Sequence, residues 1–386
     1  MAKIVILGSA YPLRAGGLST FNERLAKEFL EMGHEVIIYT FSLQYPNLFF
    51  PGKTQYAIRP APENIDIRVK VNSINPFNWV KMGWEIGKLK PDFLVIRYWL
   101  PFMAPCLGTI AFLTKLNRKT RVVAITDNII PHERRIGDRT LTKYFIRQCH
   151  GFVTLSKSVL EQLKNFENKG KPKVYSPHPL YDNFGELVGR EAALKKLKLS
   201  EDYRYILFFG FIRDYKGLDI LLKAMSDDLV KELPVKLIVA GEFYTSEMEY
   251  LKIIRELGLG NRVILHTDFI PNELVSHYFC ASDLVVQPYK DASQSGVTQI
   301  AYHFNRPMVV SNVGALPEMV PNNVAGLVVH PEPSEVAAAI YKYFSKNLMA
   351  KFQKGVIAQK ERFTWDKLVN AIFSVAKTTA TPNDQV

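Results

Sequence analysis

Two cations stand three positions apart, just after an apolar run in the second half of the chain. Residues 209–217 read Phe-Gly-Phe-Ile-Arg-Asp-Tyr-Lys-Gly, and a helix is predicted to follow. Arg213 offers a planar fork of donors, Lys216 a mobile positive charge, and a helix N-terminus a partial positive charge. Together these groups are suited to holding a diphosphate. An ordinary loop with two solvated cations has the same spacing, so the pattern leaves both interpretations open.

A second polar segment, residues 291–299, reads Asp-Ala-Ser-Gln-Ser-Gly-Val-Thr-Gln and leads into a predicted helix over residues 300–304. Backbone N–H groups at a helix start have no partner within the helix, and hydroxyl groups beside them add further donors. Phosphate oxygens bind to such groups, although Ser, Gly and Thr are also common at ordinary helix starts. The candidate contacts in this segment are Asp291, Ser295, Gly296 and Gln299.

A glycine pair, Gly16 and Gly17, lies in the loop after the first predicted strand. Glycines allow a backbone to approach an anion closely. The loop lacks the G-x-G-x-x-G spacing, and no acidic residue closes the second strand at Phe41, which argues against NAD-dependent chemistry. The P-loop pattern G-x-x-x-x-G-K-[ST] is also missing from the chain, which argues against a P-loop nucleotidase.

A third polar group follows the predicted strand at residues 121–126. Side chains at the carboxyl end of a parallel strand face the crevice where open α/β sheets bind ligands. Asp127 and His132 are therefore candidates to act on an acceptor hydroxyl. Glu133 and Arg134 are interpreted as a surface ion pair.

The elements around these groups alternate between short apolar runs and helical patterns. The first series begins with a strand at residues 3–8, followed by a helix for which Thr20 and Glu23 predict a capping box. The second series begins with a strand at residues 204–210. Two open parallel α/β sheets in sequence are the simplest architecture, which predicts two doubly wound, Rossmann-like domains over residues 1–185 and 186–364 that face a cleft.

Charge is distributed unevenly over the 386 residues, whose formal net charge is +12. Residues 1–185 hold 26 Lys and Arg against 14 Asp and Glu, whereas residues 186–386 hold 23 of each. The first half is therefore expected to face a polyanion: an anionic membrane, an acidic substrate or a nucleic acid. No RNA-binding aromatic motif accompanies the charge, which argues against nucleic acid.

The three cysteines lie far apart and form no C-x-x-C pair. We therefore expect no structural metal site, and we expect the protein to lie in a reducing compartment. The sequence begins without a signal-peptide pattern and has no apolar stretch long enough to span a bilayer, so a soluble or peripheral protein is expected.

Residues 75–90 mix aromatic residues with lysines. Such a segment can lie amphipathically at a membrane interface. More often a helix of this kind buries its aromatic side chains against its own sheet, and we favour that interpretation.

Taken together, these residues resemble the family 4, or group 1, nucleotide-sugar glycosyltransferases with the GT-B fold. The resemblance rests on motifs in the family's order along nearly the whole chain. They are the Gly16-Gly17 loop, Asn128-Ile-Ile-Pro-His-Glu, Gly210-x-x-Arg213-x-x-Lys216-Gly, Ala240-Gly241-Glu242, Ser282-Asp283-x-x-x-x-Pro288-Tyr289, Arg306-Pro-Met-Val-Val-Ser311 and Phe363-Thr-Trp365.

The resemblance implies two Rossmann-like domains, a donor site mainly in the second, and a retaining transfer without a metal or other cofactor. It also implies that residues 365–386 form a helix crossing back to the first domain, followed by a tail. Glu242, in one of the matching motifs, is a further candidate for a donor contact. The sequence departs from the family at its usual Glu-x7-Glu pattern, where Ala292 and Ile300 stand, with Asp291 and Gln299 as the nearest polar residues. The frequent family histidine before Asn128 is Asp127 here.

The expected function is transfer of a hexose from a UDP- or GDP-sugar to a glycan or lipid-linked acceptor, in the synthesis of cell-envelope or surface polysaccharide. The expected location is the cytoplasm, at the inner face of the membrane. Two other functions remain open: a nucleotide-sugar epimerase of similar fold, which releases nucleotide without an acceptor, and a relative that binds sugar nucleotide or glycan without turnover.

Overall fold

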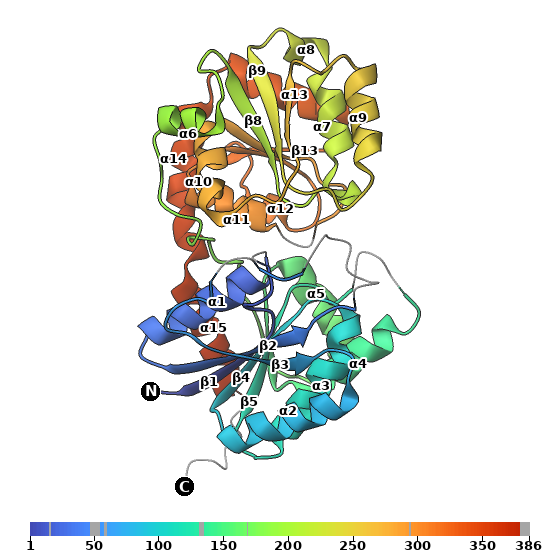
Figure 1. The fold of residues 1–386 in the computed structure, drawn as a ribbon, viewed down its shortest axis with the longest axis vertical. Coiled ribbons are helices and arrows are strands. Elements are labelled where there is room, and N and C mark those ends of the chain that lie inside the picture. The colour runs from blue at the N-terminus through green and yellow to red at the C-terminus, as the bar shows by residue number, and fades with distance from the viewer. Residues whose placement is uncertain are drawn as a thin grey trace. The chain divides into compact units, whose positions relative to one another are not determined.

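The computed structural model describes residues 1–14, 17–46, 55–57, 60–130, 135–167, 169–292 and 295–378. The chain divides into two compact units. The first unit comprises Met1–His178 and the segment from Thr364 onward, and the second comprises Pro179–Phe363. Figure 1 colours the first unit blue to green with a terminal red helix, and the second green to red.

The first unit is built on a parallel sheet with the strand order β3-β2-β1-β4-β5-β6-β7 in the described residues. The central strands are buried on both faces because helices cover both, which explains their continuous apolar runs. The strands are β1 (Lys3–Leu7), β2 (Glu35–Leu43), β3 (Asp66–Asn72), β4 (Phe93–Tyr98), β5 (Arg121–Thr126), β6 (Gly151–Thr154) and β7 (Lys173–Tyr175).

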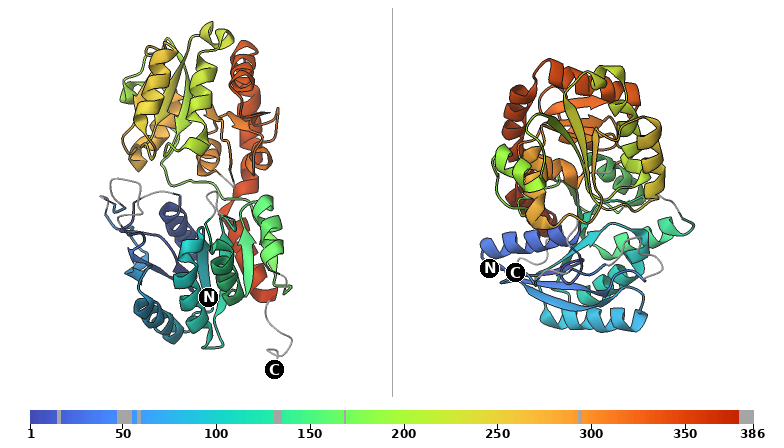
Figure 2. Two further views of the ribbon diagram at one scale, coloured as in Figure 1. Left: turned by 90° about the vertical axis from the view of Figure 1, so that its right-hand side faces the viewer. Right: turned by 45° about the horizontal axis from the view of Figure 1, so that its top comes forward.

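Helices lie on both faces of this sheet (Figure 1). One face carries α1 (Ser19–Glu31) and α15 (Trp365–Thr378), and their contact includes the Phe21 and Trp365 rings, 5.0 Å apart. In the left view of Figure 2, α15 is the red helix within the first unit. The other face carries α2 (Pro76–Leu89), the short η2 (Pro101–Met103), α3 (Ala104–Lys115), α4 (Asp138–Gln148) and α5 (Lys157–Phe166).

The predicted capping box at the start of α1 is wrong. The helix begins at Ser19, its N-cap position is Leu18, and no described side chain caps it. Thr20 is buried within the first turn, and the Glu23 carboxylate accepts a hydrogen bond from the backbone N–H of Tyr11 at 2.8 Å. Glu23 therefore holds the loop after β1.

The second unit also contains a parallel sheet, with the order β10-β9-β8-β11-β12-β13 in the described residues. The prediction of two doubly wound parallel sheets is confirmed. The strands are β8 (Arg204–Phe209), β9 (Val235–Ala240), β10 (Val263–His266), β11 (Leu284–Gln287), β12 (Met308–Ser311) and β13 (Gly326–Val329).

Two groups of helices cover the second sheet (Figures 1 and 2). One face carries α7 (Leu218–Met225), α8 (Asp228–Lys231), α9 (Glu247–Glu256) and α13 (Pro333–Ser345). The opposite face carries α6 (Arg190–Leu197), α10 (Asn272–Ala281) and α11 (Gly296–His303). The short η3 (Asp214–Lys216) precedes α7, α12 (Leu316–Met319) follows β12, and α14 (Met349–Gln359) with η4 (Lys360–Phe363) leads the chain toward α15.

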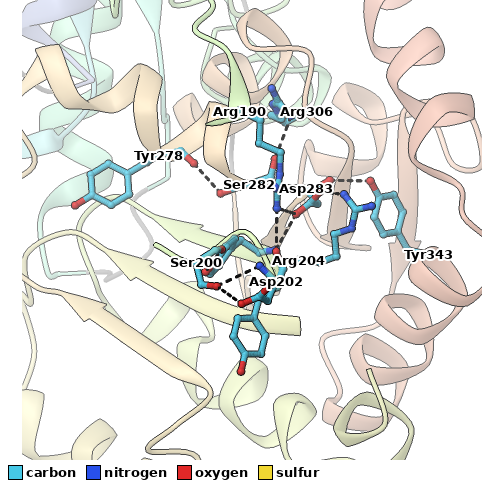
Figure 3. A network of polar contacts seen from close by, with 11 residues as sticks. Arg190, Ser200, Asp202, Arg204, Tyr278, Ser282, Asp283, Arg306 and Tyr343 are labelled. Carbon is cyan, nitrogen blue, oxygen red and sulfur yellow. Dashed lines mark hydrogen bonds and ion pairs between the residues drawn. The ribbon is translucent and has the colours of Figure 1, made fainter. Parts of the chain in front are cut away.

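A buried carboxylate joins several of these elements. Asp283, just before β11, accepts hydrogen bonds from Arg204 at 3.1 Å, from Arg190 at 3.4 Å and from the Tyr205 backbone N–H at 2.8 Å. Its own carbonyl oxygen accepts from the Tyr343 hydroxyl at 2.7 Å. As Figure 3 shows, these contacts converge on Asp283 from α6, β8 and α13. Asp283 lies at the amino end of β11, so we assign it a structural role.

Candidate active site

The strand order of the second sheet reverses between β8 and β11, and we call this place the switch point. From β8 the chain adds strands toward β9 and β10, and from β11 it adds them toward β12 and β13 on the other side. In open α/β sheets, ligands bind at the carboxyl ends of the two strands that flank such a switch point. The loops that start at Gly210 and Pro288 leave from this place.

Lys216 lies in the loop after β8, at the carboxyl ends of the strands, and it is a buried lysine. Its side chain is only 9% exposed, and it forms no hydrogen bond or ion pair with another described residue. Burial, and next the positive charge of Arg213, lower the pKa of the ammonium to about 7. A buried cation without a counter-ion is costly to the free protein and is ready to bind an anion.

Arg213 begins the same 3₁₀ turn, and its carbonyl oxygen accepts from the Lys216 backbone N–H at 2.9 Å. Its side chain is exposed, with the guanidinium carbon 5.1 Å from the centre of the Tyr244 ring. An aromatic face attracts a cation, so Tyr244 helps to fix the direction of the guanidinium. The structure therefore brings the two predicted cations together on one loop.

Glycines let the neighbouring loops pack backbone against backbone. Gly217 has φ 69°, and a β-carbon there would collide with the carbonyl oxygen of Pro288. Gly241 has φ 141°, and a β-carbon there would collide with the carbonyl oxygen of Gly210. These contacts lock the ends of β8, β9 and β11 together. They place Glu242, which is buried, in the loop beside Arg213 and Lys216, where its carbonyl oxygen accepts from the Ile212 N–H at 2.9 Å.

Ser295 is the N-cap of α11 and is committed to contacts within the protein. Its hydroxyl donates to Gln287 Oε1 at 2.6 Å and accepts from the Thr298 N–H at 3.4 Å. The Thr298 hydroxyl donates to the same Gln287 oxygen at 3.1 Å. What α11 offers a ligand is therefore its backbone N–H groups and its dipole. At Gly296 a β-carbon would lie 2.9 Å from the Tyr181 ring, so the first turn has room only for glycine.

Gln299 lies in α11 and is fully buried, yet among the described residues neither its amide nitrogen nor its amide oxygen has a hydrogen-bond partner. Within the same residues the amide nitrogen of Gln287 has no partner either. Such groups cost roughly 1–3 kcal/mol each when they stay unpaired. The donor contact expected at Gln299 stays a prediction.

In the first unit, the switch point lies between β1 and β4, and Arg97 occupies it. This guanidinium is 2% exposed and pairs with both oxygens of Asp127, at 2.7 and 3.0 Å. It also donates to the Gly17 carbonyl oxygen at 3.0 Å and lies 3.8 Å from the centre of the Phe21 ring. Arg97 thus connects the glycine loop to the end of β5.

Arg97 was not among the site residues predicted from the sequence. The available signal was a charge within the apolar run of β4, because a buried charge needs a partner. The partner is Asp127, whose two carboxylate oxygens are both used by this pair. A role of Asp127 on an acceptor hydroxyl remains a prediction.

Two of the predicted site residues, Gly16 and His132, lie outside the described residues. Asp291 is exposed after β11. Among the residues that are described, no group of three or more His, Cys, Asp or Glu side chains is placed to hold a metal ion. No helix in the described ranges combines the length and apolar character needed to cross a bilayer.

Known families and proteins match both units. Residues 15–176 match the family model described as Glycosyltransferase Family 4, and residues 203–346 match the one described as Glycosyl transferases group 1. An uncharacterised glycosyltransferase of Methanocaldococcus jannaschii is 24% identical, over 97% of this chain and 98% of its own. A D-inositol 3-phosphate glycosyltransferase of Thermobifida fusca is 25% identical, over 86% of this chain and 81% of its own.

Solved structures show the same fold. Sucrose-phosphate synthase from Thermosynechococcus elongatus superposes with a TM-score of 0.76 at 15% identity, covering 97% of this chain and 98% of that one. HepE of Anabaena, in complex with UDP and glucose, superposes with a TM-score of 0.72 at 16% identity, covering 98% and 99%. The fold shared with these structures is GT-B, with two Rossmann-like units.

Proposed function

Since the chain belongs to the group 1 and family 4 glycosyltransferases, we propose that it transfers a hexose, with retention, from a nucleotide diphosphate sugar. The acceptor we propose is a glycan or a lipid-linked glycan in the synthesis of cell-envelope or surface polysaccharide, at the inner face of the membrane. The observation that carries the donor proposal is Lys216, a buried ammonium at the switch point of the second sheet. It has no hydrogen-bond or ion-pair partner in the described residues, and the centre of the Tyr289 ring lies 5.8 Å from its nitrogen.

The chemistry that this loop supports is departure of a diphosphate. As the bond to the anomeric carbon breaks, negative charge builds on the leaving phosphate, and preorganised cations stabilise it most where water is excluded. Lys216 supplies a buried charge and Arg213 an exposed, bidentate one. The N–H groups at the start of α11 add partial positive charge. These groups supply the positive charge that a divalent cation supplies in other transferases, so we propose transfer without a metal.

For the donor, UDP-sugars are the first choice to test, because the related fold of HepE binds UDP and glucose. For the acceptor, the excess of cations in residues 1–185 favours a molecule that carries phosphate or acidic sugars. The Gly17 loop, held by Arg97, is the part of the first unit that we assign to acceptor binding.

The test has two stages. Thermal shift with UDP-, GDP- and ADP-sugars identifies the donor, because a ligand that binds only the folded state raises the melting temperature. Transfer to a lipid-linked glycan is then followed by NMR, in which the coupling of the anomeric proton reports retention or inversion. Release of free nucleotide without any acceptor would instead indicate an epimerase.

If the protein binds the donor but shows no turnover with any acceptor tested, it binds sugar nucleotide without catalysing transfer. One observation makes this outcome worth testing: the buried, apolar Ile300 stands where the family usually has a glutamate. Inversion of the anomeric centre would overturn the retaining mechanism while leaving the donor assignment intact.

A further inference from the structure

Helix α2 exposes a row of large apolar side chains to solvent. Phe77, Val80 and Trp84 are 88%, 44% and 51% exposed. Their spacing of three and four places them on one side of the helix. Met82 and Ile86, on another side, are buried in the core of the first unit. The helix is therefore apolar on two sides, and its own unit uses only one of them. The interpretation we favoured from the sequence, burial of the aromatics against the sheet, is wrong for Phe77 and Trp84.

Helix α3 extends this surface. The two helices pack closely, since a β-carbon at Gly83 would lie 2.6 Å from the Leu113 β-carbon. On α3, Phe112 and Leu116, the residue that follows its last turn, are 43% and 48% exposed. Both helices cover the same face of the sheet (Figure 1), so their outward sides face the same way. We call the set Phe77, Val80, Trp84, Phe112 and Leu116 the α2–α3 surface.

Cations accompany this surface. Lys81 and Lys88 follow Phe77 and Trp84 by four residues each and are exposed on the same side of α2, without an ion pair in the described part of the chain. The one acid of the helix, Glu85, is neutralised by Lys70 at 2.7 Å. On α3 the only charged residue is Lys115. The surface is thus apolar and aromatic, and its unpaired charge is positive.

We propose that the α2–α3 surface docks on an anionic lipid bilayer. Aromatic side chains insert at the boundary between headgroups and acyl chains, and lysines beside them reach the lipid phosphates. Each Lys or Arg near such a membrane strengthens binding in a salt-dependent way. A second copy of this chain fits the surface poorly, because a two-fold interface would bring the lysines of one copy against those of the other. Residues 1–185 as a whole also carry an excess of positive charge, 26 Lys and Arg against 14 Asp and Glu.

Trp84 provides a direct measurement. Full-length protein is mixed with vesicles of equal parts phosphatidylglycerol and phosphatidylcholine, and with vesicles of phosphatidylcholine alone. We expect sedimentation with the anionic vesicles and a blue shift of the tryptophan emission that disappears in Trp84→Phe. Raising the salt to about 1 M, where the Debye length is ~3 Å, should weaken binding severalfold.

Three variants localise the contact. Phe77→Ser/Trp84→Ser should lower the partition coefficient about tenfold or more, because it removes the two largest inserting groups. Lys81→Glu/Lys88→Glu should lower it about tenfold or more on anionic vesicles. The matched control is Met248→Ser/Lys252→Glu, which changes a 67% exposed Met and a 73% exposed Lys four residues apart on α9. The control should bind like the parent.

The proposal is overturned if the parent binds neither type of vesicle, or if the α2 variants bind as well as the control. It is also overturned if the parent is a dimer by analytical ultracentrifugation and the α2 variants are monomers, since the surface then joins two copies. All substituted side chains are exposed, and circular dichroism of each variant checks its fold. The measurements use no nucleotide sugar, so their result is independent of the proposed activity.

Discussion

The ammonium of Lys216 lies directly against the backbone of Gly210: a β-carbon at position 210 would stand 3.2 Å from the nitrogen. Gly210 has φ 91°, a conformation that residues with a side chain rarely adopt. The glycine at the end of β8 thus leaves the space in which the lysine reaches the switch point.

We expect Gly210→Ala to lower kcat/KM about tenfold or more, because the new methyl group displaces the ammonium. A positive φ costs an alanine about 1–2 kcal/mol in stability. Gly258→Ala is the matched control, since Gly258 has φ 64° with nothing within 4 Å of its β-carbon position. Steady-state kinetics and thermal melting should show similar losses of stability but a loss of activity at position 210 alone. Equal activity in the two variants would contradict the placement of the lysine.

Lys216→Met should abolish most activity without weakening the fold. Loss of one preorganised charge contact lowers kcat/KM by about 10²–10³. The melting temperature should stay level or rise, because the variant removes a buried charge that has no counter-ion among the described residues. Lys223→Met, at an exposed position on α7, is the control for losing a lysine. A fall in melting temperature equal to that of a core truncation would show that Lys216 is structural.

The same lysine predicts a dependence of stability on pH. Its pKa is about 7 in the folded chain and near 10.5 when unfolded, so between these values only the unfolded chain binds the proton. The free energy of unfolding, relative to Lys216→Met, should therefore rise with pH from about 7 toward 10, by up to ~1.4 kcal/mol per unit. Below pH 7 the difference between the two proteins should be constant. Denaturant titrations of both proteins across this range test the slope, and a flat difference would mean an unshifted lysine.

Arg97 and Asp127 should behave as one unit. Arg97→Met removes the cation paired with the buried Asp127 carboxylate and should cost roughly 3–5 kcal/mol. Arg97→Met/Asp127→Leu should cost less than the sum of the two single changes. Because the Gly17 carbonyl loses its donor, we expect a higher acceptor KM with an unchanged donor Kd. Unfolding curves and initial rates measure the cycle. Additive losses would contradict the coupling.

Gln299→Leu and Gln287→Leu should have opposite effects on stability. Gln299→Leu breaks no hydrogen bond among the described residues, so the melting temperature of this variant should hold or rise. Gln287→Leu removes the acceptor of the Ser295 and Thr298 hydroxyls and should lower the free energy of unfolding by about 1–2 kcal/mol. If the bound donor supplies hydrogen-bond partners for Gln299, the donor Kd of Gln299→Leu should be severalfold higher than that of the parent. Calorimetry decides this, and an unchanged Kd would move the contact elsewhere.

The parts of the fold that the sequence predicted are those in which one physical requirement dominates. Strands such as β1 and β8 are buried on both faces, so their apolar runs admit little else. Arg213 and Lys216 could be placed on one turn because they stand three residues apart directly after a central strand. Their part in donor binding stays a prediction. By contrast, β3 lies at the edge of its sheet and carries charged, half-exposed residues, which hid it from a search for apolar runs.

The remaining misses share a cause, which is competition from groups distant in sequence. Glu23 has the spacing of a capping box, but the Tyr11 N–H takes its carboxylate. Arg97 is a charged residue in an apolar strand, and its partners Asp127 and Gly17 lie 30 and 80 residues away in the sequence. On α2, the side that carries Gly83 and Gly87 packs against α3, whereas Phe77 and Trp84 are exposed. None of these partners can be identified from local spacing.

The return of the chain to the first unit fixes the order in which the two units can be completed during synthesis. The second unit is one continuous segment, Pro179–Phe363, and has all its residues as soon as these leave the ribosome. The first needs α15, whose Trp365 packs on Phe21 and whose Phe373 packs on Phe29 and Phe93. These three rings lack their cover until α15 (Trp365–Thr378) has been synthesised. A nascent chain halted before Thr364 therefore holds a complete second unit and an incomplete first one.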